Sequence, residues 1–457
     1  MPIMNNTPDE IKKRFNNNEL TFTVIGLGRI GQPAASIFAE KGIRVYGYDI
    51  NENVINSLKN GKPTIDEPGL EEIIEKVVKN NLLIPTLYPK EAIESSDVII
   101  ICLPTPVTDD KNPDYSSIIT CFNEISKYIQ KGSLIIVEST ISPGVVENMI
   151  VPTIEKNSDL KVMMDFGIAS CPERSNPGEI IDRFKNNPRI LGGIDNKSTM
   201  VAKTIYECVV DADVILTSNP KSANAVKLVE NIFRDVNIAL MNELAILFEK
   251  LEIDIYEIIK AAKTKWNFVP HYPGSGVGGP CLPANPYYLI QEAIKVEFVP
   301  HLIRFAREIN DRMPHHLVEL TLETLNKIGK PVKDSKISIL GISYKPDVAD
   351  YQLSPAFPVI TELKKLGAKI NVFDPYFKNQ TIKNISMTED LESAVSDTDC
   401  IIIITDHKIF IDLDLNQILT LSHIPLAIVD GRNTLDIDKI PKNVIYKSIG
   451  RLLINKS

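Results

Sequence analysis

Three glycines between a strand and a helix, near the N-terminus, place the strongest constraint on the fold. The apolar run 22–25 leads directly into Gly26-x-Gly28-x-x-Gly31, and a helical pattern follows. A second strand then ends at Asp49. Strand, glycine turn, helix and strand make a βαβ unit, so the chain is expected to begin with a parallel sheet.

Each glycine of this motif has its own task in a dinucleotide site. The first permits the tight turn, the second lets the backbone approach the pyrophosphate, and the third lets the helix pack close to the strand. The helix N-terminus then faces the phosphates. The residues predicted to bind the cofactor here are Gly26, Gly28, Arg29, Ile30 and Gly31.

Asp49 selects between the two nicotinamide dinucleotides. A carboxylate at the end of the second strand accepts hydrogen bonds from the ribose hydroxyls and repels a 2′-phosphate, so NAD is favoured over NADP. The alternative is that Asp49 only caps the turn before Asn51.

A long helix and a second α/β region follow the first. Apolar residues recur at helical spacing over 222–250, and helical patterns continue to about Leu325, interrupted by a Gly- and Pro-rich loop at 270–286. The long helix has more apolar surface than one domain can bury, which favours a linker that also forms a homodimer or higher homo-oligomer. Strands are predicted at 98–103, 134–137, 337–340, 370–373, 400–404 and 427–429, and Gly367 is predicted to end a helix.

We therefore expect an α/β protein with two Rossmann-like doubly wound domains, joined by a long central helix and a helical middle domain. The predicted boundaries are 1–200 for the NAD-binding domain, 201–325 for the central domain, and 326–457 for the C-terminal domain. The second α/β domain lacks GxGxxG, so it is not expected to bind a pyrophosphate in the same way.

Composition excludes several classes of protein. The formal charge of −9 gives no broad basic surface for nucleic acid. The N-terminal segment is polar and no run of about 18 apolar residues follows, so no membrane association is expected and the cytoplasm is the expected compartment. The six cysteines are far apart without CxxC spacing, which predicts neither a disulfide framework nor a metal cluster.

Cys281 is the candidate nucleophile, because four glycines lie among the residues at 274–279 just before it. Such a loop offers free N–H groups and close ligand access. With NAD nearby, a thiol suggests aldehyde oxidation: a thiohemiacetal gives up a hydride to form a thioester, and water releases the acid. The alternative is that Cys281 is a bystander in a ligand loop. Cys102, Cys208 and Cys400 lie in apolar runs and are expected to be packing residues.

Nine segments, some of them described above, occur in a characteristic order. They are VIGLGRIGQP with YDIN, EPGL at 67–70, LPTP at 103–106, EST at 138–140, CPER at 171–174, the helix at 227–243, GVGGPC, and LGISYKP at 340–346. Over nearly its whole length the chain resembles the UDP-glucose/GDP-mannose dehydrogenase family. CPERSNPG, ILGGID and the 227–243 helix are most similar to the UDP-N-acetyl-D-mannosamine dehydrogenase branch.

The resemblance implies an NAD-dependent nucleotide-sugar 6-dehydrogenase. It would oxidise the C6 hydroxymethyl of a UDP-N-acetylhexosamine to the uronic acid in two steps. UDP-N-acetylmannosamine is the preferred candidate for this sugar, and the product would serve polysaccharide biosynthesis. UDP-glucose and UDP-N-acetylglucosamine are the alternative sugars. The C-terminal domain would bind the UDP-sugar.

The resemblance also implies roles for individual residues. Cys281 would carry the covalent intermediate, Lys227 and Asn231 would stabilise the alkoxide and thiohemiacetal oxygens, and Glu173 would handle protons or order water. Thr140 would lie near the reacting carbon, and with Thr105 would contact the cofactor. The implied substrate-binding residues are Glu173, Arg174, Lys227, Asn231, Arg234, Tyr272, Gly278, Lys345 and Arg432. Ordinary alternatives are a solvated surface lysine for Lys227 and a loop cap for Glu173.

One departure bears on the chemistry. Four residues after the thiol the family usually has Asp, but this chain has Asn285, and an amide cannot act as a base. Either Asn285 positions water while Glu173 takes the proton, or thioester hydrolysis is slow, or the chain performs less than the full reaction. The other candidates are thus a two-electron dehydrogenase and a catalytically weak NAD- and nucleotide-sugar-binding protein.

Overall fold

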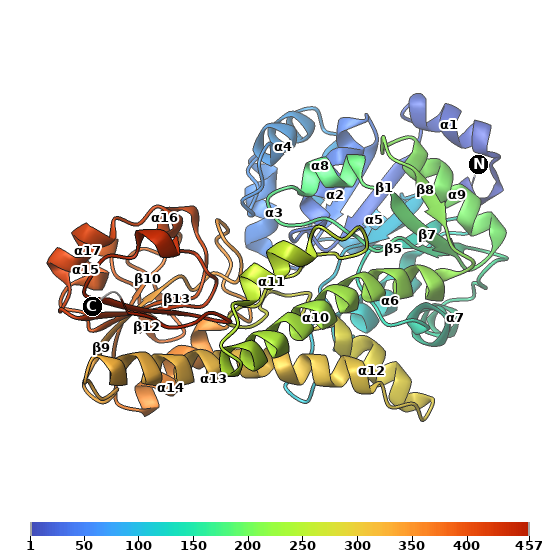
Figure 1. Cartoon of the computed structure of the whole chain (residues 1–457). Helices are drawn as coiled ribbons and strands as arrows, with labels where there is room; N and C mark the ends of the chain where they lie inside the picture. The colour runs from blue at the N-terminus through green and yellow to red at the C-terminus, as the bar shows by residue number, and fades with distance from the viewer. Residues whose placement is uncertain (1, 456–457) are drawn as a thin grey trace. The chain divides into compact units, whose positions relative to one another are not determined.

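The computed structural model describes residues 2–455, and the chain divides into two compact units. Unit 1 comprises Met1–Glu230 and Tyr287–Phe298, and unit 2 comprises Asn231–Pro286 and Val299–Ser457. Each unit contains its own β-sheet (Figure 1). Helix α10 (Pro220–Lys250) is continuous across the boundary at residue 230. The residues predicted as a central domain are therefore shared between the units, and a separate middle domain stays a prediction.

Unit 1 is built on a mostly parallel sheet of eight strands in the order β3-β2-β1-β4-β5-β6-β7-β8, in which only the β6–β7 pair is antiparallel. The strands are β1 (Thr21–Ile25), β2 (Arg44–Tyr48), β3 (Leu83–Thr86), β4 (Val98–Ile101), β5 (Leu134–Val137), β6 (Gly167–Ser170), β7 (Arg189–Gly193) and β8 (Val214–Leu216). The four predicted strands of this unit are confirmed. Strand β4 ends at Ile101, earlier than predicted, level with Ile25 and Val137, where the neighbouring strands β1 and β5 end.

Helices cover both faces of this sheet. They are α1 (Pro8–Asn16), α2 (Gly31–Glu40), α3 (Glu52–Lys59), α4 (Leu70–Lys79), α5 (Pro89–Glu94), α6 (Ser116–Tyr128), α7 (Val151–Asn157), α8 (Ile180–Asn186) and α9 (Asn196–Glu207), with short helices at Ile3–Asn5 and Val146–Ile150. Successive residues of β4 enter different cores: Val98 and Ile100 join one apolar cluster, and Ile99 and Ile101 the other. Burial on both faces explains why these strands are continuously apolar.

Unit 2 repeats the architecture with a sheet ordered β10-β9-β13-β14-β15-β16, parallel except for β15–β16. The strands are β9 (Lys336–Leu340), β10 (Lys369–Phe373), β13 (Cys400–Ile403), β14 (Leu426–Asp430), β15 (Val444–Ser448) and β16 (Ile454–Asn455), with a separate hairpin of β11 (Thr381–Ile382) and β12 (Ile385–Ser386). The four strands predicted here are confirmed.

The helices after the sheet of unit 1 are α10, α11 (Ile255–Ala262), α12 (Asn285–Lys295), α13 (His301–Lys327), α14 (Ala356–Lys365), α15 (Leu391–Val395), α16 (Lys408–Ile411) and α17 (Leu415–Leu421), with a short turn at Ile437–Lys439. Gly367 ends α14 as predicted: its φ is +89°, and its N–H donates to the carbonyl of Lys364 at 3.0 Å. No helix within residues 2–455 has the length and apolar character needed to cross a membrane.

Helices α10 and α13 lie side by side in unit 2 (Figure 1) and are joined by buried polar contacts. Arg307 Nη1 contacts Asp235 Oδ1 at 2.6 Å. Asn310 donates to the same carboxylate at 2.9 Å and accepts from Asn242 at 2.8 Å. Because paired polar groups in a core accept only one geometry, these contacts fix the register of the two helices.

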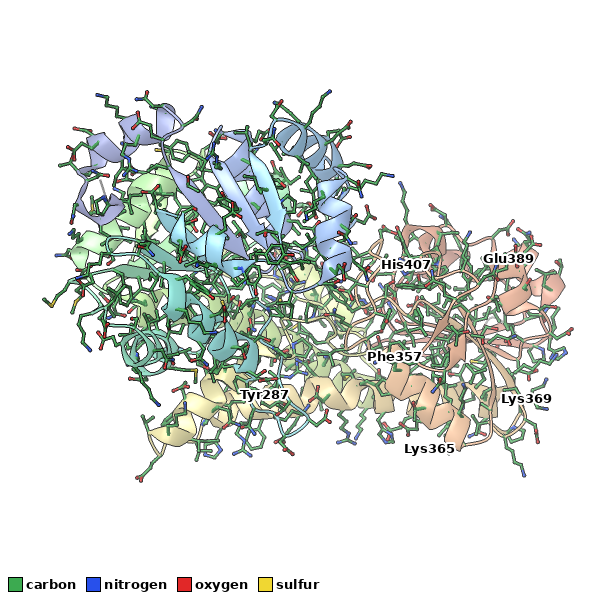
Figure 2. All side chains as sticks on the ribbon, turned by 180° about the vertical axis from the view of Figure 1, so that it is seen from behind. Tyr287, Phe357, Lys365, Lys369, Glu389 and His407 are labelled. Atoms are coloured by element: carbon green, nitrogen blue, oxygen red, sulfur yellow. The ribbon has the colours of Figure 1, made fainter. Side chains whose placement is uncertain are left out.

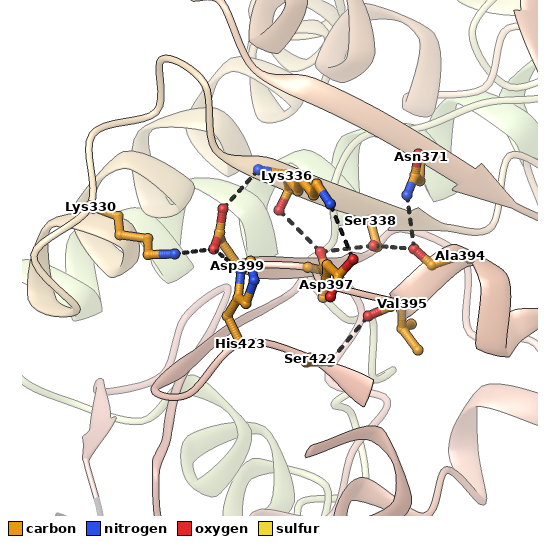
Figure 3. Close-up of polar contacts among 11 residues, drawn as sticks. Lys330, Lys336, Ser338, Asn371, Ala394, Val395, Asp397, Asp399, Ser422 and His423 are labelled. Atoms are coloured by element: carbon orange, nitrogen blue, oxygen red, sulfur yellow. Dashed lines mark hydrogen bonds and ion pairs between the residues drawn. The ribbon is translucent and has the colours of Figure 1, made fainter. Parts of the chain in front are cut away.

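Asp399 fixes the amino ends of the unit 2 strands (Figure 3). It accepts from the backbone N–H of Lys336 at 2.8 Å and lies 2.7 Å from His423 Nδ1, and it forms an ion pair with Lys330. Burial alone raises the pKa of Asp399, but these donors outweigh burial and hold that pKa below its ordinary value. These contacts lie at the amino edge of the sheet, and the carboxyl edge lies at the opposite ends of the strands.

The glycine motif of unit 1 has the geometry that its sequence predicts. Gly26 has φ of +88°, and a Cβ on Gly31 would lie 1.8 Å from the carbonyl oxygen of Gly26. A Cβ on Gly28 would meet nothing within 4 Å. Protein packing therefore requires glycine at the first and third positions, whereas it does not at the second.

We predict unequal effects of alanine at the second and third glycines of this motif. Gly31→Ala drives a methyl group into backbone that cannot move aside, so the free energy of unfolding should fall by about 3 kcal/mol. Gly28→Ala is the matched control and should change it by less than about 0.5 kcal/mol. Urea unfolding followed by circular dichroism measures both. Equal destabilisation by the two variants would contradict the packing argument.

Candidate active site

The carboxyl edge of the unit 1 sheet gathers most of the predicted cofactor and catalytic residues. Gly26 follows β1, Thr105 follows β4, Thr140 follows β5 and Glu173 follows β6. These four strands are neighbours and run parallel, so their following loops meet at one edge. Arg189 opens β7, which runs antiparallel to β6 and so begins at the same edge.

Asp49 ties the end of β2 to the glycine loop. Its Oδ2 accepts from the N–H of Leu27 at 2.7 Å, and its Oδ1 accepts from the N–H of Asn51 at 2.8 Å. The turn-capping contact is thus present, and the carboxylate is also held beside the dinucleotide loop. The open space at Gly28, the positive φ of Gly26 and the nearby carboxylate fit a bound dinucleotide.

Thr105 and Thr140 are brought together as neighbours. The hydroxyl of Thr105 donates to the carbonyl of Thr140 at 2.6 Å, and the carbonyl of Thr105 accepts from the Tyr288 hydroxyl. Tyr288 lies on α12, and its own carbonyl accepts from Ser142 Oγ at 3.2 Å. Buried Tyr288 therefore positions this loop. Sequence analysis missed it because an aromatic residue in a helical pattern has the appearance of ordinary core.

Glu173 belongs to a buried charged cluster. Arg189 lies between Glu173 and Glu138: its Nη1 contacts Glu173 Oε2, and its Nη2 contacts Glu138 Oε1 at 2.7 Å. The exposed fraction of all three side chains is under a tenth. Tyr206 donates its hydroxyl to Glu138 Oε1. Neither Arg189 nor Glu138 was among the predicted site residues, since their pairing joins segments far apart in the sequence.

The Glu173 carboxylate is well supplied with donors. Oε1 accepts from the backbone N–H groups of Arg174 at 2.6 Å and Ser175 at 2.7 Å, and Oε2 accepts from Arg189. Burial would raise the pKa of Glu173, but Arg189 and the two amides outweigh burial and hold that pKa below its ordinary value. Glu173 does cap its loop, and it is also an ionised carboxylate near the edge of the sheet.

Arg174 and Arg234 differ in their surroundings. Arg174 makes a two-pronged contact with Glu230, at 3.0 Å from Nε and 2.5 Å from Nη2, and its Nη1 donates to the carbonyl of Pro188 at 2.7 Å. Arg234 is exposed on the unit 2 part of α10. Their predicted contacts with a substrate stay predictions.

Lys227 is buried, with only 9% of its surface exposed, so the alternative of a solvated surface lysine is wrong. Among residues 2–455 no ion pair is formed with its ammonium. Among the described residues of the same unit, four buried side-chain oxygens also lack a hydrogen-bond partner, and Asn224 Oδ1 and Ser175 Oγ are two of them. Buried cations and acceptors without partners are costly, which is typical of sites that receive a polar ligand.

Asn224 is a site candidate that sequence analysis missed. It lies three residues before Lys227 on α10, which places both on one face of the helix. Its amide Nδ2 donates to Ser170 Oγ, at the end of β6, at 3.1 Å. The spacing of three residues between Asn224 and Lys227 was the sequence signal that could have identified it.

Of the six cysteines, Cys281, in unit 2, is the one that is exposed. It is thus presented at the surface of its unit, as the prediction required. Burial raises the pKa of Cys171 to about 11 and of Cys121 to about 12. Burial also raises the pKa values of the remaining cysteines, Cys102, Cys208 and Cys400, so these thiols stay protonated and unreactive at neutral pH.

The glycines before Cys281 serve close packing within unit 2. A Cβ on Gly279 would lie 2.7 Å from the Tyr344 ring, and one on Gly274 would lie 2.6 Å from Arg432 Nη1. Two of the loop's N–H groups are also occupied: Gly274 donates to Asn242 Oδ1 at 2.9 Å and Gly279 to the carbonyl of Gln352 at 2.8 Å. The prediction of a backbone with free N–H groups is therefore wrong at these two positions, because the loop is pressed against the protein.

Asn231 and Asn285 are in direct contact. The Asn231 amide donates to Asn285 Oδ1, and the backbone N–H of Asn285 donates to the carbonyl of Cys281 at 2.9 Å. A turn thus links the thiol loop to the first residue of α12 and, through it, to α10. Along α10, Asn231 contacts Asn285 beside the thiol loop, whereas Asn242 joins two helices and also holds that loop.

The carboxyl edge of the unit 2 sheet carries the remaining predicted residues. Arg432 follows β14 and contacts Asp406 at 3.2 Å, and Lys345 follows β9 and is half-buried. Tyr272 stacks on Tyr256 with 6.4 Å between ring centroids. A Cβ on Gly278 would lie 2.8 Å from the Cβ of Tyr344, which is too close for a side chain at this position.

Asp374 is the unit 2 counterpart of Asp49, and it makes the same kind of backbone contacts with one addition, a buried histidine. It follows β10 and accepts from the N–H groups of Ile342 at 2.8 Å and Ser343 at 2.9 Å. The same carboxylate lies 3.2 Å from Nε2 of His407, a fully buried residue labelled in Figure 2. His407 Nδ1 accepts from the N–H of Asp347 at 2.9 Å. Asp374 is thus committed to the protein. Among residues 2–455, no group of His, Cys, Asp and Glu side chains is placed to hold a metal ion.

Comparison with known proteins assigns a family to the chain. Three models of the UDP-glucose/GDP-mannose dehydrogenase family match the chain: the NAD binding domain at residues 20–210, the central domain at 221–312 and the UDP binding domain at 338–437. The chain is 37% identical over 433 residues to UDP-N-acetyl-D-mannosamine dehydrogenase of Pyrococcus horikoshii, covering 94% of this chain and 99% of that one.

Solved structures agree with these matches. The structure of the Pyrococcus horikoshii UDP-N-acetyl-D-mannosamine dehydrogenase aligns with a TM-score of 0.88 at 36% identity, covering 94% of this chain and 99% of that chain. An NDP-N-acetyl-D-galactosaminuronic acid dehydrogenase from Methanosarcina mazei aligns with a TM-score of 0.85 at 31% identity, covering 96% and 98%. The chain therefore belongs to the UDP-glucose/GDP-mannose dehydrogenase family and is an NAD-dependent nucleotide-sugar dehydrogenase.

Proposed function

We propose that this protein oxidises the C6 hydroxymethyl group of UDP-N-acetylmannosamine to a carboxylate, with Cys281 as the covalent catalyst. The single observation that carries the proposal is the exposure of Cys281, on a glycine loop packed tightly in place, while the pKa values of the other five thiols are raised by burial. The names of the most similar relatives support the choice of sugar.

The first oxidation converts the alcohol to an aldehyde. NAD, when bound, accepts the hydride in each of the two oxidations. The chain must stabilise the negative charge on the sugar oxygen, and buried Lys227 is the group available for this, because it forms no ion pair with an acidic side chain within residues 2–455. One good oxyanion donor contributes roughly 3 to 4 kcal/mol to such a step. Asn231, one helical turn further along α10, is proposed as a second donor.

The second oxidation uses the thiol. Cys281 adds to the aldehyde carbon, forming a C–S bond and placing charge on the former carbonyl oxygen. Loss of the second hydride from that carbon leaves a thioester. Water attacks the thioester, the C–S bond breaks, the thiol is regenerated and the acid leaves. One sugar therefore consumes one water and reduces two NAD.

Ordering of the attacking water falls to Glu173, because Asn285 carries an amide and no carboxylate. The Asn285 oxygen already accepts from Asn231, so what this amide has left to offer is its N–H groups, which position a substrate oxygen or a water. Glu173 accepts three hydrogen bonds, which keeps it ionised but weakly basic. It is thus suited to ordering a water more than to holding a proton.

We also propose that two copies of the chain associate through the unit 2 part of α10. Phe233, Leu240 and Leu247 recur every seven residues and so lie on one helix face, with 54%, 46% and 47% of their surfaces exposed. An apolar stripe of this length on a helix is unfavourable in water, and a second copy offers the same stripe in return. The free thiols favour a reducing compartment, which supports the cytoplasm.

The stoichiometry of the reaction tests the proposal. With UDP-N-acetylmannosamine, the full-length protein should produce two NADH per sugar consumed, counted by absorbance at the end of the reaction. One NADH per sugar would establish the two-electron alternative, and none with any UDP- or GDP-sugar would establish a binding protein. A panel that includes UDP-glucose and UDP-N-acetylglucosamine identifies the sugar by kcat/KM.

Cys281→Ser should abolish uronate formation while leaving NAD affinity unchanged, because a hydroxyl is a much weaker nucleophile than a thiolate at neutral pH. Cys208→Ser is the matched control and should keep the wild-type rate. Product is measured by anion-exchange chromatography. Uronate formation at the normal rate by Cys281→Ser would show that the thiol is not the catalyst.

Gly28→Ala should weaken NAD binding about tenfold or more, equivalent to about 1.4 kcal/mol, because its methyl group occupies the space that the pyrophosphate needs. The folded protein has room for that methyl group, so thermal stability should stay unchanged. Calorimetric titration with NAD measures the loss. Unchanged affinity would remove this loop from the cofactor site.

Phe233→Asp should shift the protein from dimer to monomer, because a carboxylate in an apolar interface is left unpaired. Met164→Asp, at an apolar residue 83% exposed in unit 1, is the control and should remain dimeric. Sedimentation velocity distinguishes the two states. If the wild-type protein is monomeric, the proposal of a dimer is wrong.

A further inference from the structure

The buried cluster behind Glu173 contains one cation and two carboxylates, and the proposed reaction uses only one of them. From its geometry we propose that Arg189 is a positioning residue, which holds Glu173 ionised and in a single orientation for ordering water, with Glu138 as the anchor on its other side. The inference rests on the proposed role of Glu173.

Arg189 is fixed on every side. One nitrogen contacts Glu173, a second contacts Glu138 at 2.7 Å, and Nε donates to Cys171 Sγ at 3.4 Å. The guanidinium carbon also lies over two aromatic rings, 4.4 Å from the centroid of Phe184 and 4.9 Å from that of Tyr206. A planar cation held at its edge and on its faces cannot rotate, so it imposes its orientation on the carboxylates it binds.

The groups around the two carboxylates differ. Glu138 receives hydrogen bonds from Tyr206 and Cys102, both neutral, in addition to Arg189. Glu173 receives two backbone N–H groups in addition to Arg189, and the Arg174 side chain is directed to Glu230. The remaining titratable neighbour is the Cys171 thiol, which also contacts Arg189.

These surroundings separate the two acids. Burial raises the pKa of Glu138 despite its contact with Arg189. The pKa of Glu173 is instead held below its ordinary value by Arg189 and the two amides, against the effect of burial. The guanidinium is therefore shared, but only the acid at the edge of the site has its pKa held below the ordinary value.

Removing the cation should reverse the state of Glu173. Without Arg189, burial is opposed only by the two amides, so the pKa of Glu173 rises. A protonated carboxyl donates a hydrogen bond where the ionised form accepts one, and it no longer orders a water for attack. Activity should then be lost at the acid end of the pH range and recovered as the pH rises.

The test is the pH dependence of kcat/KM of the full-length protein for UDP-N-acetylmannosamine, measured from about pH 6 to about pH 9. Arg189→Gln should move the acid limb upward by about one pH unit or more. Arg189→Lys keeps the charge and should move it less. Glu138→Gln disturbs the same cluster but keeps the Arg189–Glu173 pair, so its acid limb should stay at or below the wild-type position.

An unshifted acid limb in Arg189→Gln would overturn the inference, as would equal upward shifts in Arg189→Gln and Glu138→Gln, which would indicate general loosening. If circular dichroism shows Arg189→Gln unfolded, Arg189→Lys decides: a wild-type profile overturns the inference, and a smaller upward shift supports it. Glu173→Gln separates the two proposals. A wild-type rate there removes Glu173 from the reaction, whereas loss of activity in Glu173→Gln with an unshifted Arg189→Gln rejects the role of Arg189 alone.

Discussion

Backbone approaches too close for any side chain determine where both functional loops of this protein lie. In unit 1 the first turn of α2 lies against the carbonyl of Gly26, so the loop after β1 turns at the edge of the sheet with Gly28 open to a ligand. In unit 2 the loop before Cys281 is pressed against Tyr344 and the loop of Arg432. The same residue type thus serves two purposes, ligand approach in one unit and internal packing in the other.

The second purpose changes how the thiol loop should be understood. A glycine-rich segment is usually read as flexible, but four contacts fix this one: the amide of Asn242, the carbonyl of Gln352, the Tyr344 ring and the turn at Asn285. A nucleophile gains from such a support, because its position is set before the substrate arrives and little ordering remains to be done during reaction.

Local sequence patterns predicted the elements of this fold well, because each depends on residues close together in the chain. The glycine motif, the continuously apolar strands, the long helix and the end of α14 at Gly367 are all confirmed. The charged cluster was not predictable, since Glu138, Glu173 and Arg189 meet only after three strands are aligned in the sheet. The same applies to Tyr288 and Asn242, whose contacts join separate segments. The predicted roles in substrate binding depend on a ligand and stay predictions.

The division of the chain into units has a consequence for how the protein is made. Unit 1 includes Tyr287–Phe298, and within it Tyr288 holds the loop of Thr105. A ribosome delivers the chain from the N-terminus, so the first unit cannot be completed until the whole leading segment of the second unit, Asn231–Pro286, has emerged. Truncation after residue 230 would leave a sheet without the helix that steadies its catalytic edge. The two halves are therefore products of one folding process, and exchanging either with a relative would require moving the inserted helix as well.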